Sequence, residues 1–178
     1  MQNSPIITKS LLSTVLENYH LPFSGIHGIT HWARVLENGR RLAAITGANL
    51  AVVELFAIFH DSKRQNESRD KGHGKRGAEL ASQLRPAYLV LSDQEFRLLY
   101  LACSDHTDGH TEADITIQTC WDSDRLDLGR VGIRPRKFKL CTAAAKDSNI
   151  LLWANRRSQS RHVPDLINHE WGLSLSIQ

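Results

Sequence analysis

Histidine and aspartate side chains, which can bind metal ions and transfer protons, stand near the ends of apolar segments in this chain of 178 residues. His60 and Asp61 are adjacent, and they directly follow the apolar run of residues 50–59. Two titratable groups at the end of a buried segment are costly unless a charge or a hydrogen bond holds them. The other candidates of this kind are His27, His31, His73, His106, Asp122 and Asp124. We therefore expect several distant helix ends to converge on one site.

The residue types of this set indicate a transition-metal site. Imidazole and carboxylate ligands together suit zinc, manganese, iron or nickel better than calcium, whose ligands are oxygens. His27 and His31 are four residues apart, so they share one face if this segment is helical. That pair alone is a weak signal, because the segment lacks the glutamate of a zinc-protease helix. A single histidine beside an apolar helix is more often a hydrogen-bonded core residue, so the metal hypothesis depends on the whole set.

The elements that must position these residues are predicted to be helices. Residues 50–59 are apolar on all sides, which is typical of a helix surrounded by other helices. Ser92 and Glu95 form a capping-box pattern at the start of another. Apolar residues at helical spacing predict further helices in residues 11–19, 32–45, 74–84 (closed by Pro86) and 116–130, and a last long one over 140–153. Residues 65–74 and 107–113 are expected to be loops.

The bulk composition supports this interpretation. A chain of this length as a rule forms one domain, and 41% hydrophobic with 23% charged residues is ordinary for a globular protein. No apolar stretch is long enough to span a membrane. Three cysteines without Cys-x-x-Cys spacing, and an N-terminus unlike a secretory signal, predict reduced thiols in the cytoplasm. The net charge of +3 suits an anionic substrate and gives no strong sign of nucleic acid.

Three short motifs occur in order along the chain: "HWARV" at residues 31–35, "FAIFHDS" at 56–62 and "DSDRLDLGR" at 122–130. Together they resemble the HD-domain superfamily of metal-dependent phosphohydrolases, in which a histidine, an adjacent His-Asp pair and a later aspartate lie on a bundle of helices. The resemblance covers about residues 25–145. It implies an all-α, single-domain helical bundle of the HD-domain type over residues 1–178, with residues 146–178 as a C-terminal helical extension.

The resemblance also implies a ligand set and a mechanism. One divalent cation would be held by His31, His60, Asp61 and Asp124. The ion would be Mn, Mg, Co, Ni, Zn or Fe, with one or two ions per chain. Such an ion lowers the pKa of a bound water toward neutrality, makes hydroxide available to attack phosphorus, and polarises a phosphoryl oxygen. Asp61 would also orient the attacking water.

Several residues beside these four have roles that the resemblance leaves open. In the branches with two metal ions, two further histidines bind the second ion, and His73 and His106 are candidates for that role. Either could instead act catalytically by donating a proton to the leaving group, and His73 could also be a solvated loop residue. His27 could be a ligand, a residue that orients the ligands, or neither. Asp122 belongs to the same open group.

Basic residues after the His-Asp pair are candidates for substrate binding. Lys63, Arg64 and Lys75 could bind the phosphate of an anionic substrate, and a solvated loop is the alternative for all of them. The cluster "RPRKFK" at residues 134–139 is expected to lie on the surface.

The residues after Asp61 bear on the branch of the family. Guanosine-tetraphosphate hydrolases follow their His-Asp pair closely with Glu-Asp, whereas this chain has Ser62-Lys63-Arg64. The 5'-deoxynucleotidases use a glutamate shortly after the pair, and no acid occurs here before Glu67. Arg64 falls on the lysine position of the cyclic-dinucleotide phosphodiesterases, but their "GYP" motif is absent. The branch therefore stays open.

The function expected from these residues is a metal-dependent phosphohydrolase that cleaves a phosphate ester of a nucleotide or a related small metabolite. Its partner would be that small phosphorylated substrate; no membrane partner is expected, and a homo-oligomer stays open. Whether it is a phosphomonoesterase or a phosphodiesterase is not resolved. Two alternatives remain: a di-iron oxygenase of the HD type, and a binding module that senses a nucleotide and has a metal site.

Overall fold

A computed structural model describes residues 5–174 of the chain, which form helices and connecting loops. The α-helices are α1 (Lys9–Glu17), α2 (Ile29–Thr46), α3 (Leu50–Phe59), α4 (His73–Tyr88), α5 (Asp93–Asp105), α6 (Ile115–Arg125), α7 (Ala143–Lys146), α8 (Ser148–Gln159) and α9 (Leu166–His169). Two short 3-10 helices, η1 (Leu128–Val131) and η2 (Lys137–Lys139), lie between α6 and α7. These residues contain no strand, so the predicted all-α class is confirmed.

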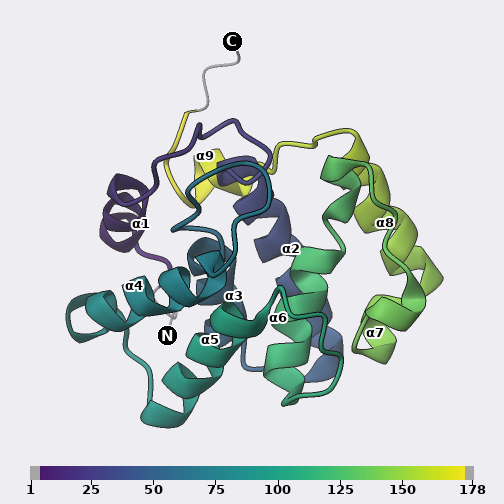
Figure 1. The fold of residues 1–178 in the computed structure, drawn as a ribbon, viewed down its shortest axis with the longest axis horizontal. Coiled ribbons are helices and arrows are strands. Elements are labelled where there is room, and N and C mark those ends of the chain that lie inside the picture. Colours follow the sequence, from purple (N-terminus) through teal and green to yellow (C-terminus); the bar gives the residue numbers. More distant parts are fainter. Residues whose placement is uncertain (1–4, 175–178) are drawn as a thin grey trace.

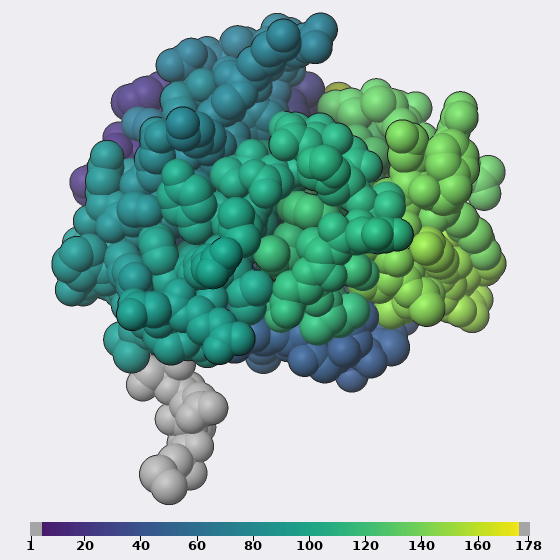
Figure 2. Space-filling view, turned by 60° about the horizontal axis from the view of Figure 1, so that its bottom comes forward, coloured from purple at the N-terminus to yellow at the C-terminus, as the bar shows by residue number. Residues whose placement is uncertain are grey.

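Helix α3 forms the centre of the bundle, as its uniformly apolar sequence predicts. Every residue from Val52 to Phe59 is buried, including Glu54, whose carboxylate accepts a hydrogen bond from Arg40. Helices α2, α4, α5 and α6 all pack against α3 (Figure 1). On the face shown in Figure 2, the teal helices α4 and α5 lie next to the green α6, with the yellow-green α8 beyond. A helix enclosed in this way places its last residues deep inside the protein.

Three predicted helix boundaries are wrong. The helix expected over residues 116–130 ends at Arg125, and a 3-10 helix follows at Leu128–Val131. Helix α4 does not close before Pro86 but continues through it to Tyr88. Pro86 lacks a backbone N–H and so removes one hydrogen bond, and this loss is tolerated because the helix ends only two residues later. The single long helix predicted over residues 140–153 is two helices. Asp147 has an extended backbone that ends α7, and its side chain accepts hydrogen bonds from the backbone N–H groups of Asn149 and Ile150 at the start of α8.

The helix ends meet in one region. His60 is the C-terminal cap of α3, His106 is the C-terminal cap of α5, and His73 is the first residue of α4. Asp124 lies in the last turn of α6.

In residues 5–174, none of the helices combines the length and the hydropathy needed to cross a lipid bilayer.

Two glycines allow α4 to approach this region closely. A Cβ at Gly74 would lie 2.3 Å from the Cys103 carbonyl oxygen of α5, and one at Gly77 would lie 2.2 Å from the Phe59 carbonyl oxygen of α3. Both contacts are with backbone atoms, which cannot move aside as a flexible side chain does. The small residues on this face of α4 therefore set how near His73 comes to His60 and His106.

We expect Gly77→Ala to lower the free energy of unfolding by about 1–3 kcal/mol, because the added methyl group would push α4 away from the end of α3. Chemical denaturation measures the change. Glu79→Ala, at an exposed position of the same helix, is the control and should stay within about 0.5 kcal/mol of the parent protein. Equal stability of the two variants would contradict the close packing of α4 on α3.

Candidate metal centre

Four side chains from three separate parts of the chain meet at the end of α3. The Nε2 atom of His31, on α2, lies 3.0 Å from Nε2 of His60, 3.4 Å from Oδ1 of Asp124 and 3.5 Å from Oδ2 of Asp61. Nε2 of His60 lies 3.8 Å from the same oxygen of Asp61 and 3.9 Å from that of Asp124. Two ligand atoms that each lie about 2.1 Å from one ion can be at most about 4.2 Å apart. These distances permit His31 and His60 to share an ion with Asp61 or with Asp124, and the ligand atoms of His31, His60 and Asp124 all lie within 4.8 Å of one another.

The hydrogen bonds of the two histidines show which of their nitrogens carry protons. Nδ1 of His31 lies 2.7 Å from Oδ2 of Asp127, and Nδ1 of His60 lies 3.1 Å from the carbonyl oxygens of Phe56 and Ala57. Because carboxylates and carbonyls only accept hydrogen bonds, each Nδ1 is the donor. In the neutral form of both rings, the two Nε2 atoms face each other with lone pairs. Such a contact needs a cation, a proton or a metal ion, between the two nitrogens.

Asp124 supplies a further sign of a ligand position. Its Oδ1 atom is buried and accepts no hydrogen bond from the described residues, and the nearest positive group, Nη2 of Arg130, is 3.7 Å away. Burial would raise the pKa of Asp124, but Arg130 and His60 outweigh it and hold the pKa well below its usual value. A buried anionic oxygen without a donor is rare and costly, and a metal ion would satisfy it.

A second group of ligand atoms lies on the other side of Asp61. Nε2 of His73 is 3.0 Å from Oδ1 of Asp61 and 3.0 Å from Nε2 of His106, which is itself 3.8 Å from Asp61 Oδ1. Nδ1 of His73 donates to the Asp70 carbonyl and Nδ1 of His106 to the Cys103 carbonyl. The lone pair of His106 Nε2 is therefore directed into this group, whereas that of His73 Nε2 accepts a hydrogen bond from Nη1 of Arg64 at 3.1 Å. Asp61 offers one carboxylate oxygen to each of the two groups.

The electrostatics of Asp61 keep its carboxyl group charged. Burial would raise the pKa of Asp61, but its interactions with His60, His106 and His27 hold the pKa well below the usual range. Burial would likewise lower the pKa of His106, but Asp61 and Asp124 raise it. In His60, burial dominates and lowers the pKa to about 3, so this imidazole is neutral at pH 7. A neutral imidazole and a charged carboxylate are the forms that bind metal ions.

His27 does not share a helical face with His31, because α2 begins only at Ile29 and His27 lies in the turn before it. Its Nδ1 atom nevertheless lies 2.8 Å from Oδ2 of Asp61. Burial lowers the pKa of His27 in spite of this carboxylate, which favours the neutral ring. His27 therefore holds Oδ2 of Asp61, the oxygen that faces His31. His27, His31 and Asp61 also form a further set of residues that could hold a metal ion.

The other candidates occupy different positions. Asp122 is not brought to the centre, because its carboxylate accepts hydrogen bonds from the backbone N–H groups of Cys141 and Thr142. Nζ of Lys63 donates to the Asn18 carbonyl, and Lys75 is exposed on α4.

Arg64 is the one predicted substrate-binding residue that reaches the second group. Its guanidinium is buried, and Nη1 lies 3.1 Å from Nε2 of His73 and 3.5 Å from Oδ1 of Asp61. The positive charge of this side chain therefore borders the ligand atoms and is available to an anionic substrate there.

Asp127 is a residue of the centre whose role the sequence interpretation missed. Its carboxylate accepts from His31 and also from Nε of Arg34 at 2.7 Å, and the two bonds fix the His31 ring. The hydrogen bond to His31 and the nearby Arg34 outweigh burial and lower the pKa of Asp127. A signal was present: Arg34 follows His31 by three residues and Asp127 follows Asp124 by three, so each lies one helical turn from a ligand.

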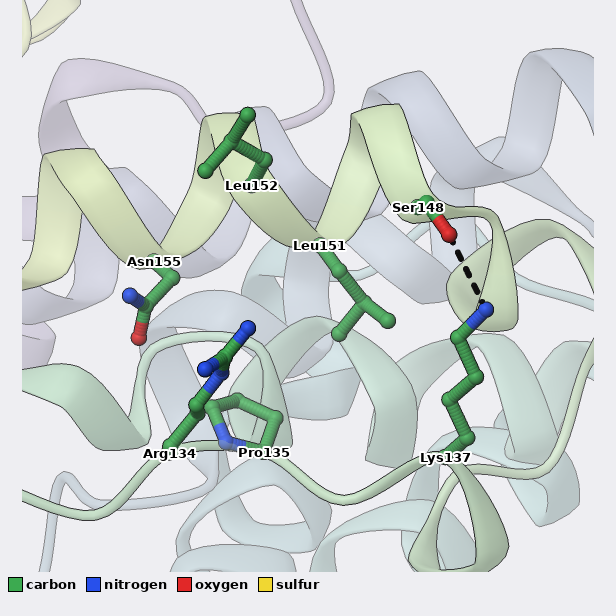
Figure 3. A pocket seen from close by; sticks show the side chains of 7 residues that line it. All are labelled: Arg134, Pro135, Lys137, Ser148, Leu151, Leu152 and Asn155. Carbon is green, nitrogen blue, oxygen red and sulfur yellow. Dashed lines mark hydrogen bonds between the residues drawn. The ribbon is translucent and has the colours of Figure 1, made fainter.

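Another hollow lies away from this centre. It has a volume of about 180 Å3 and is formed by α8 and the segment before η2, with Arg134, Lys137, Leu151 and Asn155 among its lining residues (Figure 3). Nζ of Lys137 donates to the Ser148 hydroxyl across it. No histidine or carboxylate lines this hollow, so it has no metal ligands of the kind found at the end of α3. Most of the predicted surface cluster at residues 134–139 is indeed exposed.

Comparison with known proteins gives no match: no family model, no curated protein and no solved structure is significantly similar to this chain. The chemistry of the centre is therefore judged from its own residues.

We expect Asp127→Asn to weaken metal binding by about 10–100-fold, because the loss of the carboxylate removes the group that orients His31. Competition with a chelator measures the affinity, and circular dichroism shows whether the variant is folded. Asp165→Asn, at an exposed position, should bind metal like the parent protein. Unchanged affinity in folded Asp127→Asn would exclude this positioning role.

In the metal-free protein we expect stability to decrease as the pH falls below about 6. The histidine of the unfolded chain titrates near pH 6.5, whereas the pKa of His60 in the folded protein is about 3, so unfolding takes up a proton. This residue alone contributes a loss of about 1.4 kcal/mol per pH unit between the two values. Urea unfolding from pH 7 to pH 4 should show a shallower slope for His60→Gln, and an unaltered slope for the exposed-site variant His169→Gln. A parental slope in His60→Gln would refute the assignment.

Proposed function

We propose that this chain is a metal-dependent phosphohydrolase of the HD-domain type, acting on a phosphate ester of a nucleotide or a related small metabolite. The observation that carries the proposal is the position of Asp61, whose two oxygens each face a pair of imidazole Nε2 atoms. The unpartnered oxygen of Asp124 adds a second anionic ligand to the first group. This donor set suits Mn, Mg, Co, Ni, Zn or Fe, with one or two ions per chain.

The residues of the chain have distinct parts in the proposed reaction. A bound divalent ion lowers the pKa of water toward neutrality and polarises a phosphoryl oxygen. Asp61, held anionic by the imidazoles around it, accepts a hydrogen bond from the attacking water and orients it. Arg64 pairs with the phosphoryl oxygens through a guanidinium that is already turned toward the second group. The absence of bulk water around these buried residues strengthens both interactions.

The second group supports two distinct roles. With a second ion, His73 and His106 are ligands, and the charge of that ion helps to neutralise the phosphate. Without one, His106 is placed to donate a proton to the leaving-group oxygen, because Asp61 and Asp124 raise its pKa against the effect of burial. The number of metal ions per chain decides between these roles.

A di-iron oxygenase is the second candidate. The observation that favours it is the same shared carboxylate, because Asp61 has one oxygen beside each group of histidines and the two groups would hold the irons. Two irons per chain and consumption of oxygen would support it over hydrolysis. A nucleotide-sensing binding module remains the third candidate, and it would bind a nucleotide without turnover in every metal form.

The test is to load the purified protein with each divalent ion in turn and to screen phosphate esters. We expect Asp61→Asn and Asp124→Asn to lower phosphatase activity by about a hundred-fold or more, because each removes an anionic metal ligand. His169→Gln is the matched control at an exposed histidine. Full activity in either aspartate variant would remove the proposed centre.

The role of His106 is tested separately. We expect His106→Gln to reduce the metal content from two ions per chain to one, as measured by plasma mass spectrometry, if the second group binds metal. If the parent protein holds one ion, the same variant should instead lose the alkaline limb of its pH–rate profile. A variant with parental metal content and an unchanged pH profile would exclude both roles.

A further inference from the structure

A cavity opens beside the second group of ligand atoms. Its volume is about 490 Å3, and Arg64 and His73 form its inner wall. Arg69 and Lys71 line it from the loop between α3 and α4, and Asp108 lines it from the loop after α5. Small-molecule sites have volumes of about 300–1,000 Å3, so this cavity is larger than one phosphate group needs. Part of it is therefore available to the remainder of a substrate.

The loop that forms the cavity wall is held rigidly from inside. The carboxylate of Asp70 accepts hydrogen bonds from the Gln65 backbone N–H at 2.7 Å and from Nη2 of Arg76 at 2.6 Å. Arg76 also donates to the backbone carbonyls of Lys63 and Lys71 at 3.1 Å each. Nη2 of Arg64 donates to the Ser68 carbonyl at 2.6 Å. A loop backbone pinned at this many points holds the Cα positions of Arg69 and Lys71 in place, so binding does not have to order the backbone as well as the side chains.

The charges that remain on this wall are positive. Arg76 neutralises Asp70, and Arg64 borders Asp61. Arg69 and Lys71 are exposed, and no ion pair among residues 5–174 involves either of them. Asp108 is the one other acidic side chain of the cavity lining. Two cations and one anion thus leave an excess of positive charge in a concave site, where electrostatic attraction is concentrated.

We propose that this cavity binds a second anionic group of the substrate, so that preferred substrates carry a phosphate or carboxylate in addition to the phosphate that is cleaved. Arg69 and Lys71 are then specificity-determining residues, because they contact the second anion and stand apart from the metal ligands. Asp108 opposes them and weakens the preference. This inference rests on the proposed phosphohydrolase function, since it places the scissile phosphate at Arg64 and His73.

The experiment compares two non-hydrolysable probes that differ in one charge. These are 4-carboxyphenylphosphonate and its neutral amide, 4-carbamoylphenylphosphonate, titrated calorimetrically into the metal-loaded protein at low ionic strength. We expect the carboxylate probe to bind about ten-fold more tightly, as two partly solvated ion pairs would give. The preference should decrease with added salt, because salt screens exposed charges.

Three variants make the comparison decisive. Arg69→Gln combined with Lys71→Gln should bind both probes equally, and Asp108→Asn should increase the preference for the carboxylate. Lys137→Gln combined with Lys139→Gln removes two exposed cations elsewhere and should keep the parental preference. Equal binding of the two probes by the parent protein, absence of binding, or an unchanged preference in the Arg69 and Lys71 double variant would overturn the proposal.

The outcome is separable from that of the proposed function. A protein that cleaves no phosphate ester in any metal form, yet prefers the carboxylate probe, would retain the anion site and lose the hydrolase assignment. A protein that is an active hydrolase without this preference would retain its function and lose the anion site.

Discussion

Two imidazole nitrogens, Nε2 of His31 and Nε2 of His60, lie 3.0 Å apart in the interior of this protein. Each ring has its other nitrogen bonded to an oxygen acceptor, so in the neutral rings neither Nε2 carries a proton. The arrangement is stable only around positive charge. The carboxylates of Asp61 and Asp124, which face the same point, require positive charge there too.

The surroundings of the centre follow from this requirement. Asp127 fixes the His31 ring, and Arg34 and Arg130 balance the buried aspartates. Removing one member of such a network leaves an uncompensated charge in the interior. The free-energy cost of that charge exceeds the stabilisation that the intact network provides. The ion pairs Arg34–Asp127 and Arg130–Asp124 therefore depend on the residues at the end of α3 and are not independent surface contacts. The buried position of α3 has the same origin, because its end must deliver His60 and Asp61 to the middle of the molecule.

Much of the fold could be predicted from periodicity. The apolar run of α3, the capping box of α5 and the segment that became α2 were predicted because local spacing and capping chemistry determine them. Of the predicted ligands, His31 and His60 are brought close to each other and to both Asp61 and Asp124, although the binding of metal is still a prediction. The break at Asp147 was not predicted, since a single side chain that caps one helix and ends another is not visible in apolar spacing.

What could not be predicted depends on contacts between distant segments. The two roles of Asp61 depend on which way its oxygens turn, and that is decided by His27 on one side and His73 on the other. The path of residues 65–72, which brings His73 back toward Asp61, is set by Asp70 and Arg76 rather than by any regular pattern. Asp122 was left open beside Asp124, and only the tertiary structure shows it capping residues 141–142.

A single carboxylate divided between two sets of imidazoles makes them thermodynamically dependent on each other. A bound ion that drew charge from one oxygen of Asp61 would reduce the basicity of the other. Occupancy on one side would then change the affinity on the opposite side, and the effect would be equal in both directions. Two ions would then load with unequal strength although each set contributes two histidines. Partial occupancy would be an inherent property of the centre, adjustable by the concentration of free ion.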